Sequence, residues 1–166
     1  SSRALFDLTY ENTIFEAEGV EAYCRYQIEH ESEILNPGPG FPLVKALLDL
    51  NELPGREESV EVIIMSRNSP DSSLRVFNAI EHYGLNITRA VLAGASLAPY
   101  LSAFKTDLFL SAYEDDVQSA IDSNIAAGII CTDGLRTYDC DHQIRQIRIA
   151  FDGDAVLFSD ESEQIF

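Results

Sequence analysis

Short apolar runs alternate with segments of helical character along most of this chain. The clearest run is Val60–Ser66, which is rich in valine and isoleucine and is typical of a buried strand. Strands that alternate with helices of about ten residues indicate right-handed crossover connections between parallel strands. We therefore predict an α/β fold, with a doubly wound and mostly parallel sheet whose two faces are covered by helices.

The apolar runs and the turn residues between them place the individual elements. We predict strands at Arg3–Leu8, Val60–Ser66, Ala90–Gly94, Asp107–Ala112 and Gly128–Cys131, with a sixth in the run that begins at Ile147. We predict helices at Gly19–Glu31, Phe41–Leu50, Pro99–Phe104 and Glu114–Ala127, and one more between Pro70 and Tyr83. The gap between the first two strands is longer than one crossover needs, which predicts a small helical cap insertion at about residues 10–57.

The charge of the chain argues against two classes of partner. The 166 residues carry a net charge of −17, so we expect no nucleic acid partner and no anionic membrane surface. Hydrophobic residues make up 46% of the chain, which is enough for a globular core. The three cysteines form no C-x-x-C pair, and no signal peptide or long apolar segment is visible, so we expect a reducing, cytoplasmic location. The pattern leaves open whether the protein forms a homo-oligomer.

Two carboxylates separated by one glycine follow the apolar run that begins at Ile147. Asp152 and Asp154 stand where a strand would end, and the ligands of open α/β sheets bind at strand ends. Side chains two positions apart on an extended backbone point the same way, so these carboxylates could share a divalent cation. Alternatively, one could attack a substrate while the other moves a proton. Gly153 between them allows a sharp turn and the close approach of a ligand.

The first residues of the chain are similar to this motif. Arg3–Thr9 aligns with Arg148–Asp154, and in both segments a phenylalanine precedes an aspartate. Asp7 therefore corresponds to Asp152, whereas Thr9 stands where the later segment has its second aspartate. The similarity is either a chance match or the trace of a duplicated unit whose first copy has degenerated.

The later motif resembles that of a known family. Phe151–Val156 resembles motif I of the haloacid dehalogenase (HAD)-like superfamily of phosphotransferases, and Arg148–Glu163 is similar to the cytosolic 5'-nucleotidase type I family. Further segments similar to that family are Gly19–Tyr23, Arg25–Gln27, Pro37–Pro39, Phe41–Leu47 and Leu110–Ala112. The resemblance covers nearly the whole chain. It implies a HAD-like fold and a magnesium-dependent phosphomonoesterase that acts on nucleoside 5'-monophosphates such as AMP.

The resemblance also assigns roles to single residues. Asp152 would attack phosphorus and form an aspartyl-phosphate, and Asp154 would protonate the leaving ribose oxygen and then activate water. Mg²⁺ would be held by the Asp152 carboxylate and the Asp154 backbone carbonyl. In the upstream copy, Asp7 matches the nucleophile position, Ser66 the phosphate-binding hydroxyl and Lys105 the lysine of the motif.

The upstream residues also have purely structural interpretations. Ser66 could belong to a strand-to-helix turn, and Lys105 could complement the dipole near the end of a helix. The acids that would complete an upstream metal site are missing from the end of the predicted strand Asp107–Ala112. We therefore interpret the upstream copy as degenerate, with Ser66 and Lys105 as its candidate substrate contacts.

The later motifs of the superfamily would lie downstream of Asp152. We therefore expect residues 1–145 to form a degenerate HAD-like α/β domain, and residues 146–166 to begin a second, catalytic unit. On this interpretation the chain is the N-terminal half of a longer enzyme, together with the first piece of its catalytic half. Two alternatives stay open, a non-catalytic regulatory or dimerisation module and a phosphatase for another small phosphomonoester.

Overall fold

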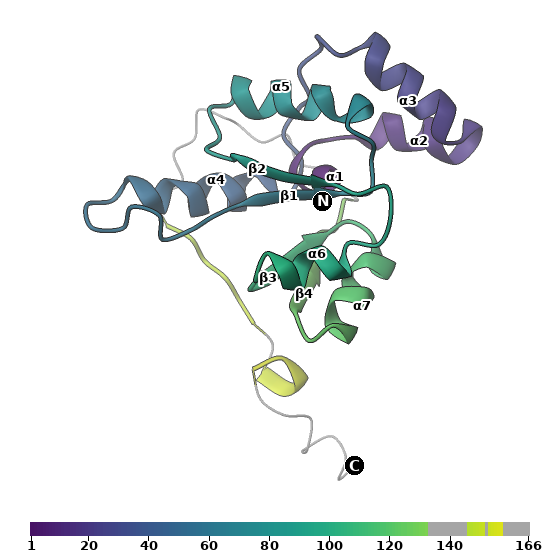
Figure 1. The fold of residues 1–166 in the computed structure, drawn as a ribbon. Coiled ribbons are helices and arrows are strands. Elements are labelled where there is room, and N and C mark those ends of the chain that lie inside the picture. The colour runs from purple at the N-terminus through teal and green to yellow at the C-terminus, as the bar shows by residue number, and fades with distance from the viewer. Residues whose placement is uncertain (133–145, 152, 158–166) are drawn as a thin grey trace.

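The computed structural model describes residues 1–132, 146–151 and 153–157. Its strands form two small sheets of parallel strands (Figure 1). In one sheet β1 (Ile63–Ser66) pairs with β2 (Arg89–Leu92), and in the other β3 (Leu108–Ser111) pairs with β4 (Ala126–Ile129). Parallel strands joined by helices confirm the α/β class. Among the described residues, however, two separate pairs stand where the sequence predicted one larger sheet.

Each connection between paired strands contains a helix. α5 (Leu74–His82) joins β1 to β2 after the short 3-10 turn η2 (Asp71–Ser73), and α7 (Glu114–Asp122) joins β3 to β4. α6 (Ala98–Ala103) connects β2 to β3 and so links the two sheets. Gly84 follows the end of α5, and its φ of +61° is a left-handed conformation that glycine adopts without strain.

The helix predicted to reach Ala127 ends earlier. α7 stops at Asp122, and Asn124 has a φ of +61°, which turns the backbone out of the helix. The next residues pair with β3, and Ala126 lies opposite Leu108. Alanines at this position favour a helix by propensity, but the free edge of β3 supplies hydrogen-bond partners that a continued helix would leave unused.

The first predicted strand is a helix instead. Ser2–Leu5 forms α1, and the following residue, Phe6, makes only an isolated antiparallel bridge with Pro37. An apolar run this short fits either a strand or a turn of helix, so periodicity alone could not separate the two.

A glycine-containing loop fixes α1 in place. The backbone amides of Gly38 and Gly40 donate hydrogen bonds to the carbonyls of Leu5 and Ala4, each at 2.8 Å. A Cβ atom on Gly40 would lie 2.6 Å from the Ala4 carbonyl oxygen, and one on Gly38 would lie 2.8 Å from the backbone of Phe6. Only glycine allows the two backbones to come this close.

The segment between α1 and β1 is mostly helical. α2 (Thr9–Glu18) and α3 (Val20–Glu29) lie side by side, joined by Gly19 with a φ of +85° (Figure 1). α4 (Phe41–Asp49) and the 3-10 turn η1 (Leu50–Glu52) follow. The helices predicted at 19–31 and 41–50 are therefore confirmed.

A buried ion pair attaches α2 and α3 to α5. Nη1 of Arg75 lies 2.5 Å from Oε1 of Glu11, and the two side chains are only 8% and 7% exposed. The same guanidinium donates to the Glu33 carbonyl at 2.8 Å and to the amide oxygen of Gln27 at 3.4 Å. These contacts compensate for the removal of both charges from water.

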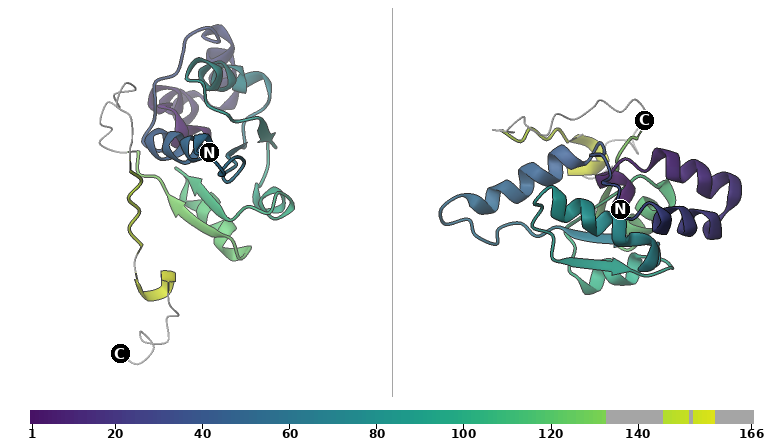
Figure 2. Two further views of the ribbon diagram at one scale, coloured as in Figure 1. Left: turned by 90° about the vertical axis from the view of Figure 1, so that its left-hand side faces the viewer. Right: turned by 90° about the horizontal axis from the view of Figure 1, so that it is seen from above.

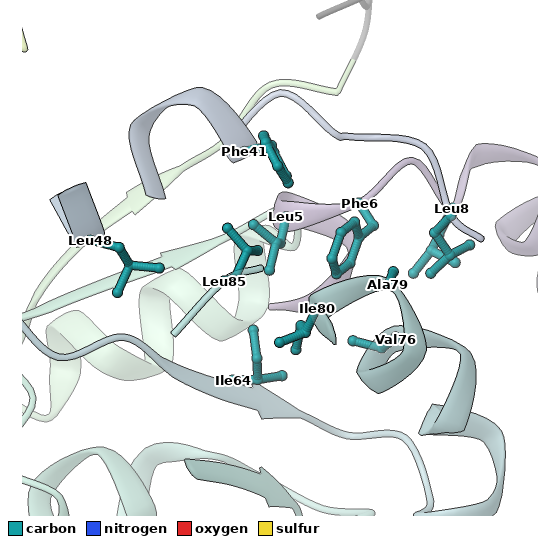
Figure 3. Packing of buried hydrophobic residues seen from close by; sticks show 11 residues of the cluster. Leu5, Phe6, Leu8, Phe41, Leu48, Ile64, Val76, Ala79, Ile80 and Leu85 are labelled. Carbon is teal, nitrogen blue, oxygen red and sulfur yellow. The ribbon is translucent and has the colours of Figure 1, made fainter. Parts of the chain in front are cut away.

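Two hydrophobic clusters form the core. Figure 3 shows the larger cluster, in which side chains from α1, α4, α5 and β1 converge. Its members are Leu5, Phe6, Leu8, Leu35, Phe41, Leu48, Ile64, Val76, Ala79, Ile80 and Leu85. The second cluster lies between β1, β2, α6, β3 and α7, and consists of Met65, Val91, Leu97, Leu101, Phe109 and Ala120. Successive residues of β1 thus pack into different clusters, because strand side chains alternate between the two faces.

The strand predicted from Ile147 is not present in the described part of the chain. Residues 146–151 have no regular secondary structure, and Gly153–Leu157 forms a π-helical turn, η3. Ile149 and Phe151 are 54% and 59% exposed rather than buried. Both segments lie apart from the two sheets (Figure 2). The composition of the apolar run suits a strand, but a strand also needs a neighbouring strand with which to form hydrogen bonds. No described strand pairs with residues 146–151.

Candidate functional site

The carboxyl ends of β1 and β3 lie at one cavity of about 620 Å³. α1 contributes Arg3, the end of β1 and the chain after it contribute Ser66–Ser69, and the chain after β3 contributes Tyr113 and Asp116. Side chains from α2 and α3, among them Asn12 and Tyr23, line the cavity as well. A cavity at strand ends that helices cover is the usual position of a ligand site in an α/β protein.

Both strands end in a serine that forms the same local turn. The Ser66 hydroxyl accepts a hydrogen bond from the Asn68 amide at 3.1 Å, and the Ser111 hydroxyl accepts one from the Tyr113 amide at 3.2 Å. Both serines are buried. Each turn places the residues that follow the strand beside the cavity, and each hydroxyl still has its own proton to donate.

Two arginines flank one aromatic ring at this cavity. The Arg3 guanidinium carbon lies 5.5 Å from the centre of the Tyr113 ring, and that of Arg67 lies 5.3 Å from it. Arg67 Nε also lies 3.5 Å from Oδ1 of Asp116. Arg3 Nε is buried and has no hydrogen-bond partner among the residues that the structure describes. The ring therefore holds two cations together without neutralising them.

Tyrosine hydroxyls connect the helices to the strand ends. The Tyr23 hydroxyl accepts hydrogen bonds from the side-chain amides of Gln27 and Asn68, both at 2.9 Å. The Tyr113 hydroxyl donates to Asn12 Oδ1 at 3.2 Å. Burial raises the pKa of Tyr23 above its ordinary value, so the phenol stays protonated at neutral pH. Both tyrosines thus position neighbours through hydrogen bonds.

The structure separates the residues that the sequence singled out in the upstream copy. Ser66 lines the cavity described above. Asp7 does not line it, and its carboxylate accepts the Thr9 amide at 3.0 Å where α2 begins. Lys105, with a φ of +51°, follows α6 and lines a second cavity of about 570 Å³ whose walls include residues of β1 and β3. Ser66 therefore lies with Arg3 and not with Lys105.

The later motif lies largely outside what can be described. Asp152 is outside the described residues, and of Asp154 the structure describes only the backbone, within η3. In the part of the chain that is described, no group of three or more histidine, cysteine, aspartate or glutamate side chains could hold a metal ion. No described helix is both long and apolar enough to cross a lipid bilayer.

Sequence reasoning missed most of the residues around the cavity. Arg3 was assigned to a strand, and Tyr113 was given no role. Residues 67–69 directly follow the predicted strand Val60–Ser66, and that position was a usable signal, since strand exits in α/β folds carry ligand contacts. Arg3 gave no comparable signal, because only the fold brings residue 3 next to residue 113.

Comparison with known proteins places the chain in a family. The family model described as 5'-nucleotidase matches residues 1–166. Human cytosolic 5'-nucleotidase 1B is 40% identical over 169 residues, which cover 98% of this chain and 27% of that protein. The chain thus spans about a quarter of the length of this curated relative. No solved structure matches it. Because the family model covers the chain from end to end, this protein belongs to the 5'-nucleotidase family.

Proposed function

We propose that the protein of which this chain is part is a magnesium-dependent, cytoplasmic 5'-nucleotidase that hydrolyses nucleoside 5'-monophosphates. The observation that carries the proposal is the sequence Asp152-Gly153-Asp154, in a chain that the 5'-nucleotidase family model matches throughout. The name of the human relative, a cytosolic 5'-nucleotidase, supports the same substrate class and location. The proposal treats residues 1–145 as one unit and residues 146–166 as the start of the catalytic unit.

The chemistry needs a nucleophile and a group that moves a proton. In the proposed reaction, Asp152 attacks phosphorus, and the bond to the 5' oxygen of the nucleoside breaks. Asp154 donates its proton to that oxygen, then takes a proton from the water that hydrolyses the aspartyl-phosphate. The ionised carboxylate of Asp152 and the anionic phosphate repel one another, so the site needs a compensating positive charge.

Magnesium suits this donor set. Carboxylate and backbone carbonyl oxygens are the ligands that Mg²⁺ accepts, and Asp152 and Asp154 offer both kinds. When bound, the ion would supply the charge that allows a carboxylate to approach an anionic phosphate. The described residues do not test this fit, because Asp152 lies outside them.

The direct test is phosphate release by the complete protein. Asp152→Asn and Asp154→Asn keep side-chain size but remove the nucleophile and the proton carrier, so each should abolish magnesium-dependent hydrolysis of AMP. Asp71→Asn is the matched control, since Asp71 is an exposed acid outside the motif. Full activity in Asp152→Asn would refute the assignment. Comparable turnover of glucose 6-phosphate by the unmutated protein would instead favour a broader phosphomonoesterase.

A further inference from the structure

We propose that the cavity beside Ser66 binds the phosphate group of a nucleotide without hydrolysing it, as a ligand site separate from Asp152 and Asp154. The residues that line the cavity are by themselves enough to support binding of a phosphate group. The choice of a nucleotide, rather than another phosphate ester, also rests on the proposed function. The cavity would therefore be a second place where the protein recognises its class of substrate.

The charge at the cavity is opposite to that of the chain as a whole. Acids outnumber lysines and arginines by 28 to 11, yet Arg3 and Arg67 both lie against the Tyr113 ring. One carboxylate, that of Asp116, is close to this pair. The local balance is therefore positive in a protein that elsewhere repels anions. Such a position selects an anion, and the planar guanidinium group suits phosphate oxygens.

A buried donor at this cavity has no acceptor. Arg3 Nε is buried without a hydrogen-bond partner among the described residues, although Arg3 lines the cavity. The described ion pairs include none of Arg3. An anion in the cavity would give its guanidinium the opposite charge that the described residues do not supply. Ser66 offers a second donor, because its hydroxyl accepts the Asn68 amide and keeps a proton. The guanidinium of Arg3 and the hydroxyl of Ser66, which come from α1 and β1, therefore line the same cavity.

The cavity is large enough for more than a phosphate. Its volume of about 620 Å³ falls within the range of about 300–1,000 Å³ that is typical of small-molecule sites. Its apolar and aromatic lining residues include Leu8, Phe15, Val20, Tyr23, Met65 and Leu97. Most of these come from α2, α3 and the segment before them. A base could pack on that wall while the phosphate lies at the arginines.

The cavity lacks the means to hydrolyse what it binds. Asp116 is the only carboxylic acid among its described lining residues, and it lies 3.5 Å from Arg67. Asp7, the counterpart of Asp152, is not a lining residue, and it accepts the Thr9 amide at the start of α2. Hydrolysis through an aspartyl-phosphate needs a carboxylate free to attack phosphorus. The arrangement therefore supports binding without turnover.

Cysteine protection can measure occupancy of this cavity directly. Cys24 lines the cavity and is half-buried, whereas Cys131 is exposed and lines neither cavity. We would treat the complete protein carrying Asp152→Asn with iodoacetamide and follow each cysteine by mass spectrometry. AMP should slow the alkylation of Cys24 in a saturable manner and leave Cys131 unchanged. Inorganic phosphate should compete with AMP, and adenosine should bind far more weakly.

Two arginine variants in the same background make the test specific. Arg67→Gln should weaken protection by AMP at least about tenfold, because it removes a charged hydrogen-bond donor. Arg67→Lys should restore part of the loss. Arg56→Gln is the matched control, since Arg56 is exposed and does not line the cavity. It should leave protection unchanged.

The outcomes separate this proposal from the proposed function. Unchanged protection in Arg67→Gln, no protection by AMP, or equal protection by adenosine would each overturn the site. Retained hydrolysis of AMP by the Asp152→Asn protein would overturn the proposed function. It would not overturn the site, because occupancy of the cavity is measured by the alkylation rate of Cys24. Loss of hydrolysis together with Arg67-dependent protection would support both.

Discussion

The buried pair between Arg75 and Glu11 should be among the most sensitive positions for stability. In Glu11→Ala the guanidinium of Arg75, whose side chain is 8% exposed, would lose its only buried carboxylate partner among the described residues. It would keep the Glu33 carbonyl at 2.8 Å, a weak contact to Gln27 at 3.4 Å and a long ion pair, at 3.7 Å, with the Glu33 carboxylate, whose side chain is 61% exposed. Breaking one partner of a buried ion pair costs about 3–5 kcal/mol, because the other charge stays in the interior. With an m value of about 2 kcal/mol/M, the urea midpoint should fall by roughly 2 M.

Urea unfolding of this chain, followed by circular dichroism, would measure the loss. Asp49→Ala is the control, because it breaks the Lys45–Asp49 pair, whose side chains are 39% and 41% exposed. It should lower the free energy of unfolding by at most about 1 kcal/mol. Replacing both buried partners, as in Glu11→Leu with Arg75→Met, should recover much of the loss, since no charge stays unpaired. If Glu11→Ala were no more harmful than Asp49→Ala, the reasoning from burial would be refuted.

Two further predictions concern close packing and ionisation. Gly40→Ala should lower the free energy of unfolding by about 1–3 kcal/mol in the same urea assay, because the new Cβ would lie 2.6 Å from the Ala4 carbonyl oxygen; an unchanged midpoint would contradict the close approach. Burial raises the pKa of Tyr23 above 10.0, so the unfolded chain loses that proton first. The stability that Tyr23 contributes should be complete below about pH 10 and decline above it, whereas Tyr23→Phe should be less sensitive over the same alkaline range. Equal pH dependence in the two proteins would show that Tyr23 is not the group responsible.

Sequence periodicity predicted the elements whose partners are local or strongly patterned. β1, α3 and α4 are close to their predicted positions, because a valine- and isoleucine-rich run and two amphipathic stretches favour one structure each. The first strand was wrong, since the loop glycines Gly38 and Gly40 hold that segment as α1. The run from Ile147 has the composition of a strand but no paired edge among the described residues.

The sequence could likewise predict one part of the candidate site and not the rest. Ser66 could be found because it ends a recognisable strand, and ligand contacts concentrate at such ends. Arg3 and Tyr113 could not, because their proximity depends on how α1 packs beside β3. Nor could the sequence show that Lys105 lines a different cavity from Ser66. The roles of Asp152 and Asp154 stay predictions that the described residues do not test.

Locating the phosphoryl group during turnover would test the proposed role of Asp152 most directly. The complete protein would be mixed with AMP and Mg²⁺, quenched in acid within milliseconds, digested and examined by mass spectrometry. We expect a phosphoryl group on Asp152 that is absent from the Asp152→Asn protein. Steady hydrolysis of AMP with the phosphoryl group on another residue, or with none trapped on any residue, would contradict it.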